Sequence, residues 1–230
     1  MNFLKRSYEK ELLDGNDIPF DDIKKNMQEL NFINEWLGGH AITIKGFKNL
    51  AGCQKNITVC ELGCGGGDNL LAVYKWSRSK NINVSLVGID IKEECIDFAK
   101  TRAELTGVAE WITSDYRTVS FVDNPDIIFS SLFCHHFTDD ELTEQLRWMK
   151  ENSRIGFFIN DLQRNALAYY SIKTLTKLFS SSYLVKNDAP LSVARGFIKS
   201  EWQKLCEQAE VENAIIKWKW AFRFLIIYKK

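Results

Sequence analysis

The sequence has little of several features that mark specialised classes of protein. With three prolines in 230 residues and no internal repeats, it shows no low-complexity linker. Its six cysteines form no C-x-x-C pair, which argues against a zinc knuckle or a redox motif and favours reduced, mostly buried thiols. No apolar run is long enough to span a bilayer.

The sequence also has no excess of positive or negative charge. Thirty Lys and Arg residues balance thirty Asp and Glu residues, and no basic stripe stands out. A nucleic-acid backbone is therefore an unfavourable partner. The N-terminus, residues 1–6, lacks the apolar core of a signal peptide, so we expect a cytoplasmic protein. The sequence does not indicate an oligomeric state.

The pattern of apolar residues predicts strands that alternate with helices. Five strands are expected at 57–62, 84–90, 109–113, 127–132 and 155–159. Residues 1–20 are predicted to be irregular, and residues 183–198 a loop. Helices are expected at 21–37 (ended by Gly38-Gly39), after Asp68, from about Cys95 to near Gly107, after the capping box Thr138/Glu141, at 165–182 and after a cap at Ser200. Two closing strands are expected at about 211–218 and 222–228.

This alternation predicts an α/β fold, a Rossmann-like doubly wound sheet with helices on both faces. The two closing strands have almost no connection between them, so they must be antiparallel to each other. We expect five parallel strands that end in a C-terminal antiparallel hairpin. We expect residues 1–230 to form one domain, with an N-terminal helical cap at 1–45 and a lid insertion at 162–198.

The segment from Val59 to Asp68 is the strongest single motif. It predicts a buried strand that ends at Glu61-Leu62, a turn with Gly63, Gly65 and Gly67, and a helix for which Asp68 is a suitable N-cap. Such a turn builds a nucleotide-type pocket at the carboxyl end of a parallel strand. A dinucleotide fingerprint needs glycine or alanine at position 68, so the spacing favours S-adenosylmethionine over NAD.

Acidic residues stand where such a ligand needs hydrogen-bond acceptors. Asp90 ends the second strand, about 20 residues beyond the turn, where an acid can accept from ribose hydroxyls; the alternative is a helix cap. Glu61 lies in an apolar strand end, where an unpaired carboxylate is costly. Backbone amides or the methionine ammonium of the cofactor can compensate, and a structural role in ordering the turn is the alternative.

Four segments together resemble the class I S-adenosylmethionine-dependent methyltransferases, over about residues 57–160. They are the glycine motif at 61–67, Val87-Gly88-Ile89-Asp90, Ser114-Asp115-Tyr116, and the stretch from Ser131 to Asp139 with its His135-His136 pair. The resemblance is to the ubiquinone/menaquinone-biosynthesis-like branch that acts on small molecules. The segments 160–164 and 188–192 are similar to a bacterial subgroup associated with polyketide pathways.

This resemblance implies S-adenosyl-L-methionine as cofactor and S-adenosyl-L-homocysteine as product. It implies that Asp115 accepts from the adenine amine, although a solvated turn acid is the alternative. Ile91 and Tyr116 would pack on the adenine or belong to the core, and Ser131 would line the cofactor site. No Asn/Asp-Pro-Pro-Tyr sequence follows residues 127–132. Enzymes of this fold that methylate amino groups of nucleic acids usually have that motif, so its absence argues against DNA or N-methylation as the activity.

The histidines are candidate catalytic residues. His135 or His136 would flank the methyl-transfer site, and an imidazole can remove a proton from a phenol or enol. Adjacent residues of an extended segment point in opposite directions, so at most one should face the acceptor. Packing and hydrogen bonding are the alternative role. With no further spaced ligands and with His40 standing alone, we expect no metal site.

The remaining candidates concern the acceptor. Asn160 and Asp161 would lie at the pocket rim, Arg195 would clamp an acidic group or be solvated, and Trp36, Tyr169 and Tyr170 would line an apolar pocket or be core. The expected function is methyl transfer to oxygen or carbon of a small, largely apolar acceptor, aromatic or polyketide-like. The alternatives are a noncatalytic S-adenosylmethionine-binding protein and a dinucleotide-dependent oxidoreductase.

Overall fold

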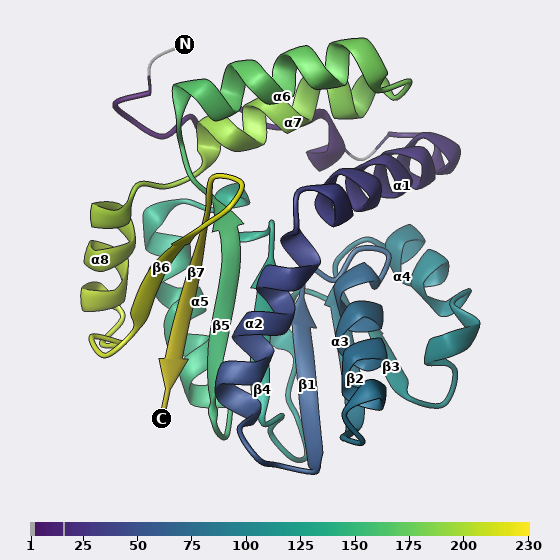
Figure 1. The fold of residues 1–230 in the computed structure, drawn as a ribbon, viewed down its shortest axis with the longest axis vertical. Coiled ribbons are helices and arrows are strands. Elements are labelled where there is room, and N and C mark those ends of the chain that lie inside the picture. The colour runs from purple at the N-terminus through teal and green to yellow at the C-terminus, as the bar shows by residue number, and fades with distance from the viewer. Residues whose placement is uncertain (1–2, 16) are drawn as a thin grey trace.

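A computed structural model describes residues 3–15 and 17–230. Met1 and Asn2, at the start of the segment expected to lack a signal peptide, and Asn16, within the expected irregular stretch, lie outside the described residues. Seven strands form one sheet in the order β3-β2-β1-β4-β5-β7-β6 (Figure 1). The strands are β1 (Asn56–Leu62), β2 (Asn83–Asp90), β3 (Ala109–Thr113), β4 (Ile127–Ser131), β5 (Gly156–Leu162), β6 (Ile215–Lys219) and β7 (Arg223–Lys229).

The sheet has the predicted topology. Strands β1 to β5 are parallel, whereas β7 runs antiparallel to β5 and β6 runs antiparallel to β7. The expected α/β sheet with five parallel strands and a closing antiparallel pair is therefore confirmed. The sheet order changes direction at β1, whose neighbours are β2 and β4. A crevice for a ligand forms at such a point, outside the carboxyl ends of the strands.

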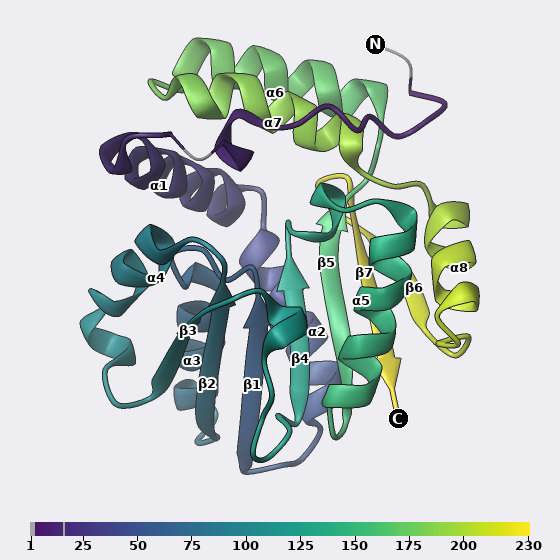
Figure 2. The same cartoon turned by 180° about the vertical axis from the view of Figure 1, so that it is seen from behind.

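Helices cover both faces of the sheet. On one face, α2 (Gly39–Ala51), α3 (Asp68–Ser79) and α4 (Glu93–Lys100) enclose a core that includes Phe47, Leu70 and Ile96. On the other face, α5 (Asp139–Asn152) and α8 (Lys199–Gln208) enclose a core that includes Leu146 and Trp202. Figures 1 and 2 show these two layers from opposite sides.

A third group of helices lies beyond the carboxyl ends of the parallel strands. It consists of α1 (Phe20–Trp36), α6 (Ala166–Phe179) and α7 (Tyr183–Arg195), which Figure 2 shows above the sheet. The N-terminal segment, residues 3–15 with the short 3-10 helix Leu12–Asp14, runs beside α7. These elements cover the carboxyl ends of the parallel strands, which is where a ligand would bind. Among the described residues, no helix combines the length and apolar character that a membrane crossing requires.

The prediction of a loop at 183–198 is wrong. Residues 183–195 form α7, in which the Ser182 side chain accepts from Val185 N and Pro190 lies inside the helix. Pro190 lacks the N–H that would close one helical hydrogen bond, which is why the sequence suggested a break. Burial decides otherwise, because Leu184, Val185 and Leu191 are buried. Tertiary packing here outweighs local propensity.

Other boundaries also differ from the prediction. Helix α2 was not predicted; it follows Gly38, whose φ of +74° permits the break between α1 and α2, and residue 45, the expected end of the cap, lies inside it. Helix α4 ends at Lys100 rather than near Gly107, and α8 has Ile198 rather than Ser200 at its N-cap. Gly67, not Asp68, caps α3. Residues 211–214 precede β6 as a turn.

Candidate functional site

The turn after β1 leaves room for a ligand at one of its glycines. Gly65 has a φ of +49°, which side chains with a Cβ rarely adopt, and a Cβ built on it would meet no atom within 4 Å. By contrast, a Cβ on Gly63 would lie 2.2 Å from the Phe133 ring, and one on Gly67 would lie 2.6 Å from Trp111. Gly63 and Gly67 are therefore needed for packing, whereas the backbone of Gly65 faces open space.

Asp90, at the end of β2, faces this turn. Its carboxylate accepts from Gly65 N at 2.8 Å and from Lys92 N at 3.0 Å. Burial raises the pKa of Asp90, and these two amide donors partly oppose the rise. The register places the two strand ends side by side, with Leu62 opposite Ile89. The carboxylate therefore braces the turn, and it also lines a cavity.

That cavity has a volume of about 160 Å³ and lies at the carboxyl ends of β1, β2 and β3. Five of the predicted cofactor residues line it, namely Gly63, Asp90, Ile91, Asp115 and Tyr116. Ile91 is 69% exposed, so its side chain is free to cover a flat ligand. Tyr116 is buried and packs edge-on against Phe133 and Phe137.

Asp115 already has a partner in this cavity. The Arg117 side chain donates through Nε to both of its carboxylate oxygens at 3.0 Å, and Arg117 N donates at 3.0 Å. The side-chain hydrogen bond from Arg117 is the main cause that lowers the pKa of Asp115. The carboxylate is thus held in its charged form at the cavity edge, where Arg117 also lies.

Glu61 is fully buried beneath the turn. Its Oε1 accepts from Asn69 Nδ2 at 3.1 Å, while its Oε2 has no hydrogen-bond partner among the described residues. Burial raises the pKa of Glu61 well above its usual value, and the Asn69 side chain and the nearby backbone N–H of Leu70 oppose this only in part. A buried carboxylate oxygen without a donor is costly. The site therefore lacks one donor, which a ligand can supply.

A polar network connects this carboxylate to two other predicted residues. Asn69 accepts from Thr43 Oγ1 at 3.0 Å, and Asn160 Nδ2 donates to Thr43 Oγ1 and to Ser131 Oγ, both at 3.3 Å. Ser131 and Asn160 are buried. The network includes Asn69 and Thr43, which sequence reasoning missed. The polar residue Asn69, two positions after the cap of α3, was the available signal.

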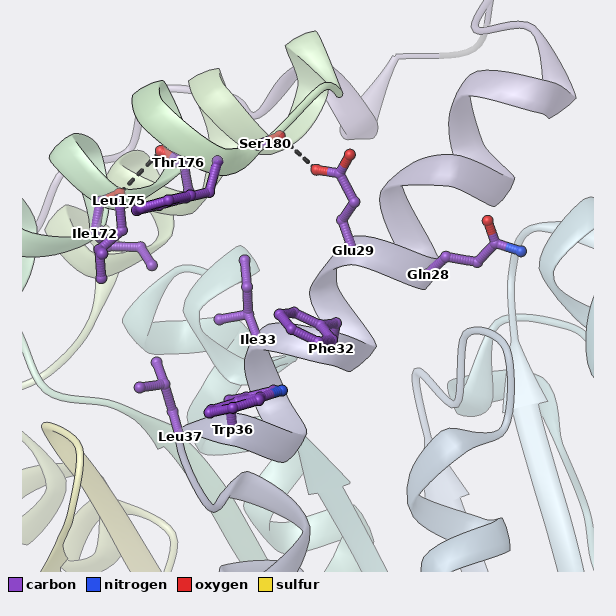
Figure 3. Close-up of a pocket in the computed structure, with 11 residues that line it drawn as sticks. Gln28, Glu29, Phe32, Ile33, Trp36, Leu37, Ile172, Leu175, Thr176 and Ser180 are labelled. Carbon is purple, nitrogen blue, oxygen red and sulfur yellow. Dashed lines mark hydrogen bonds between the residues drawn. The ribbon is translucent and has the colours of Figure 1, made fainter.

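A second, apolar groove lies between α1 and α6, with a volume of about 470 Å³ (Figure 3). Trp36 lines it and is 75% exposed, so it is not a core residue, whereas Tyr169 and Tyr170 pack edge-on against Phe3. The groove is lined mainly by apolar side chains: Phe32, Ile33, Trp36, Leu37, Ile172, Leu175 and Phe179. Glu29 closes one end, since it accepts from Ser181 Oγ at 2.8 Å and from Ser182 N at 3.2 Å.

The histidine pair lies in a 3-10 turn, Cys134–His136, and not in an extended segment. The expectation that the two rings point in opposite directions is therefore wrong: their centroids are 4.4 Å apart. His135 Nδ1 lies 2.8 Å from Asp161 Oδ1, and His136 Nδ1 lies 3.1 Å from Asp14 Oδ1. His135 is 3% exposed, whereas the His136 side chain is 23% exposed.

The N-terminal segment covers this pair and is fixed by buried charged residues. Asp188 accepts from Leu12 N at 2.8 Å and from Leu13 N at 2.9 Å. Arg195 is 4% exposed, so it is neither solvated nor free to clamp a substrate. It donates to the carbonyl oxygens of Glu9 and His136, both at 2.9 Å. The segment 188–195 thus tethers the N-terminal segment to the histidine turn.

Comparisons with known proteins agree with this geometry. Residues 59–156 match a family described as a methyltransferase domain. None of the curated proteins matches the chain by sequence. A solved structure of the plantazolicin methyltransferase BpumL, in complex with a monoazolic desmethylPZN analogue and SAH, is 17% identical, with a TM-score of 0.67 and 91% of each chain covered.

Two further solved structures share the fold. Human N-acetylserotonin methyltransferase, in complex with SAM, is 15% identical with a TM-score of 0.65, covering 92% of this chain and 56% of that one. A protein described as a possible exported protein from Bordetella parapertussis is 18% identical with a TM-score of 0.63, covering 83% and 66%. The chain thus spans less than two thirds of both proteins. Residues 59–156 thus match a methyltransferase-domain family, and the chain shares the fold of methyltransferases whose structures were solved with SAM or SAH.

Proposed function

We propose that this protein transfers a methyl group from S-adenosylmethionine to an oxygen or carbon atom of a small, largely apolar acceptor bound in the groove between α1 and α6. The observation that carries the proposal is the position of α1 between the two cavities. A Cβ on Gly66, in the cofactor turn, would lie 3.4 Å from Met27 Sδ of α1. Phe32 and Trp36, farther along the same helix, line the apolar groove.

The residues around the turn fit S-adenosylmethionine. The unpartnered Oε2 of Glu61 offers an acceptor to the α-ammonium group, and the bare backbone at Gly65 lets the ligand approach closely. Asp90 would accept from the ribose hydroxyls, with Ile91, Asp115 and Tyr116 around the adenine and Ser131 in the network below. When bound, the cofactor supplies an activated methyl group on its sulfonium.

The protein's part in the reaction is mainly to hold the two reactants in line and to exclude water. Helix α1 and the segment 162–198, which contains α6 and α7, would act as the cover. A general-base role for His135 or His136 remains a prediction. It requires access to an Nε2 atom, and both of these atoms lie near the Glu11 carboxylate, at 3.6 and 3.9 Å.

A binding titration followed by a turnover assay tests the function. We expect S-adenosylmethionine to bind at micromolar strength and S-adenosylhomocysteine to form with at least one member of a panel of phenols and quinols. Binding without turnover on any acceptor would favour the noncatalytic alternative. Tight binding of NADH with no binding of S-adenosylmethionine would favour the oxidoreductase.

The groove variant Leu175→Asp should raise the KM for an apolar acceptor about 10-fold or more. A carboxylate there removes an apolar contact worth about 1.5–3 kcal/mol and adds a charge that the acceptor would desolvate. The affinity for S-adenosylmethionine, measured by calorimetry, should not change. Val122→Asp is the matched control, because Val122 is fully exposed and lies outside the groove. Equal KM values for the two variants would exclude the groove as the acceptor site.

The affinity for S-adenosylmethionine should rise as the pH rises above the ordinary range of a glutamate, as long as the α-ammonium group stays charged. Burial raises the pKa of Glu61, so the unliganded protein binds a proton there more readily than a free glutamate does. Because the pKa of Glu61 is higher in the folded chain than in the unfolded chain, proton binding there stabilises the fold fully at pH values below the unfolded-state pKa. This stabilisation is lost as the pH rises through the folded-state pKa. The ammonium group favours the carboxylate, so binding strengthens with pH. Titrations of Glu61→Gln should show a smaller slope; an unchanged slope would remove Glu61 from the cofactor site.

A further inference from the structure

Three side chains from two distant segments converge beneath the N-terminal segment. The carboxylate of Glu11 and ring nitrogens of His135 and His136 all lie within 4.8 Å of one another. His135 Nε2 is 3.6 Å from Glu11 Oε1, and His136 Nε2 is 3.9 Å from Glu11 Oε2. These distances are too long for hydrogen bonds. Two ligands of one tetrahedral zinc ion are separated by about 3.4 Å, which is close to the observed spacing.

Both imidazoles are oriented from behind by carboxylates. With the protons on Nδ1, His135 donates to Asp161 at 2.8 Å and His136 donates to Asp14 at 3.1 Å. This leaves both Nε2 lone pairs directed toward Glu11. A carboxylate behind each ligating histidine is the usual arrangement around protein-bound zinc, because it fixes the ring and raises its basicity. Glu11 is held as well, since Ser192 Oγ donates to its Oε1 at 2.7 Å.

The surrounding charges agree with a bound dication. Around the cluster, Glu11, Asp14, Asp161 and Asp188 are acidic, whereas Arg195 and Arg6 are basic, so acidic groups outnumber basic ones. The Arg195 guanidinium donates to Asp14 Oδ2 at 3.2 Å and to backbone carbonyls, so it does not occupy the space between the Nε2 atoms and Glu11. The partly exposed His136 provides an entry path.

We propose that Glu11, His135 and His136 bind one divalent transition-metal ion of the zinc type. The ion would clip the N-terminal segment to the turn after β4. Three protein ligands leave a fourth position open for water. This site is independent of the proposed methyl transfer, because its formation needs neither cofactor nor acceptor. An ion on both Nε2 atoms would also remove the base role from these histidines.

Metal binding by the chelator-treated full chain tests the proposal. After dialysis against Zn²⁺ or Co²⁺, elemental analysis should find one ion per chain, and the Co²⁺ form should show the visible absorption of a four-coordinate site. Glu11→Gln and His136→Gln should each weaken binding about 100-fold or more, since replacing residues behind the ligands alone costs 10- to 100-fold. Circular dichroism establishes that each variant is folded.

Two control variants separate this site from adventitious binding. His40 is the other histidine of the chain, and Cys53 is an exposed thiol. His40→Gln and Cys53→Ser should keep one ion at unchanged affinity. The proposal is overturned if the wild-type chain binds less than about 0.1 ion, or if Glu11→Gln retains wild-type affinity. Should His136→Gln fail to fold, the Glu11→Gln titration and the wild-type Co²⁺ spectrum decide by themselves.

Discussion

We expect Asp90→Ala to bind S-adenosylmethionine about 10- to 150-fold more weakly than the wild-type chain. Hydrogen bonds to a charged group are worth about 1.5–3 kcal/mol, and every 1.4 kcal/mol is a factor of ten in affinity. The Asp90 carboxylate lines the cavity beside the glycine turn, so ribose hydroxyls would lose their acceptor. The variant also releases Gly65 N, which Asp90 holds at 2.8 Å.

Isothermal titration calorimetry measures this loss, with Asp97→Ala as the matched control. Asp97 lies on the neighbouring helix α4, is exposed and pairs with Lys100 at the surface. Its removal should leave the affinity within a factor of two. If a folded Asp90→Ala variant binds the cofactor as tightly as the wild type, Asp90 is not part of the site.

We expect Asp161→Ala to lower the free energy of unfolding by about 3–5 kcal/mol, the range for removing one member of a buried charged pair. Asp161 is fully buried and accepts from Cys134 N and Leu162 N, both at 2.7 Å, as well as lying 2.8 Å from His135 Nδ1. The substitution leaves these donors without acceptors. For a chain of this size the melting temperature should fall by about 6–20 °C.

Thermal unfolding of two further variants shows whether the loss of stability in Asp161→Ala comes from the lost hydrogen-bond acceptor. Asp161→Asn keeps one acceptor oxygen and should lose less, about 1–3 kcal/mol. Glu207→Ala changes an exposed acid on α8 and should stay within about 0.5 kcal/mol of the wild type. A loss for Asp161→Ala no larger than that for Glu207→Ala would mean that the turn after β4 is held by other contacts.

The features that followed from sequence were those with short-range physical causes. The five parallel strands are apolar runs bounded by turn residues, and the capping box Thr138/Glu141 is local, so both were predictable. The same holds for Asp90, since the end of a strand can be read from its hydrophobic run. Five predicted cofactor residues accordingly meet around one cavity.

The features that escaped prediction depend on contacts between distant segments. Helix α7 contains Pro190 and is stabilised by burial, which local propensity does not report. Glu11 meets the histidines across more than 120 residues, so no spacing rule could have joined them. Arg195 looked like a surface residue because its acceptors are backbone carbonyls, which have no sequence signature.

The seating of the N-terminal segment has a consequence for the order of folding. Leu12 is bound by Asp188, 176 positions later, and the Arg6 side chain donates to the carbonyl of Arg195, 189 positions later. Contacts of such large separation are slow to form, because a long loop must close first. The N-terminal segment must therefore wait for partners that are synthesised much later in the chain, and α7 and the N-terminal segment reach their final positions together.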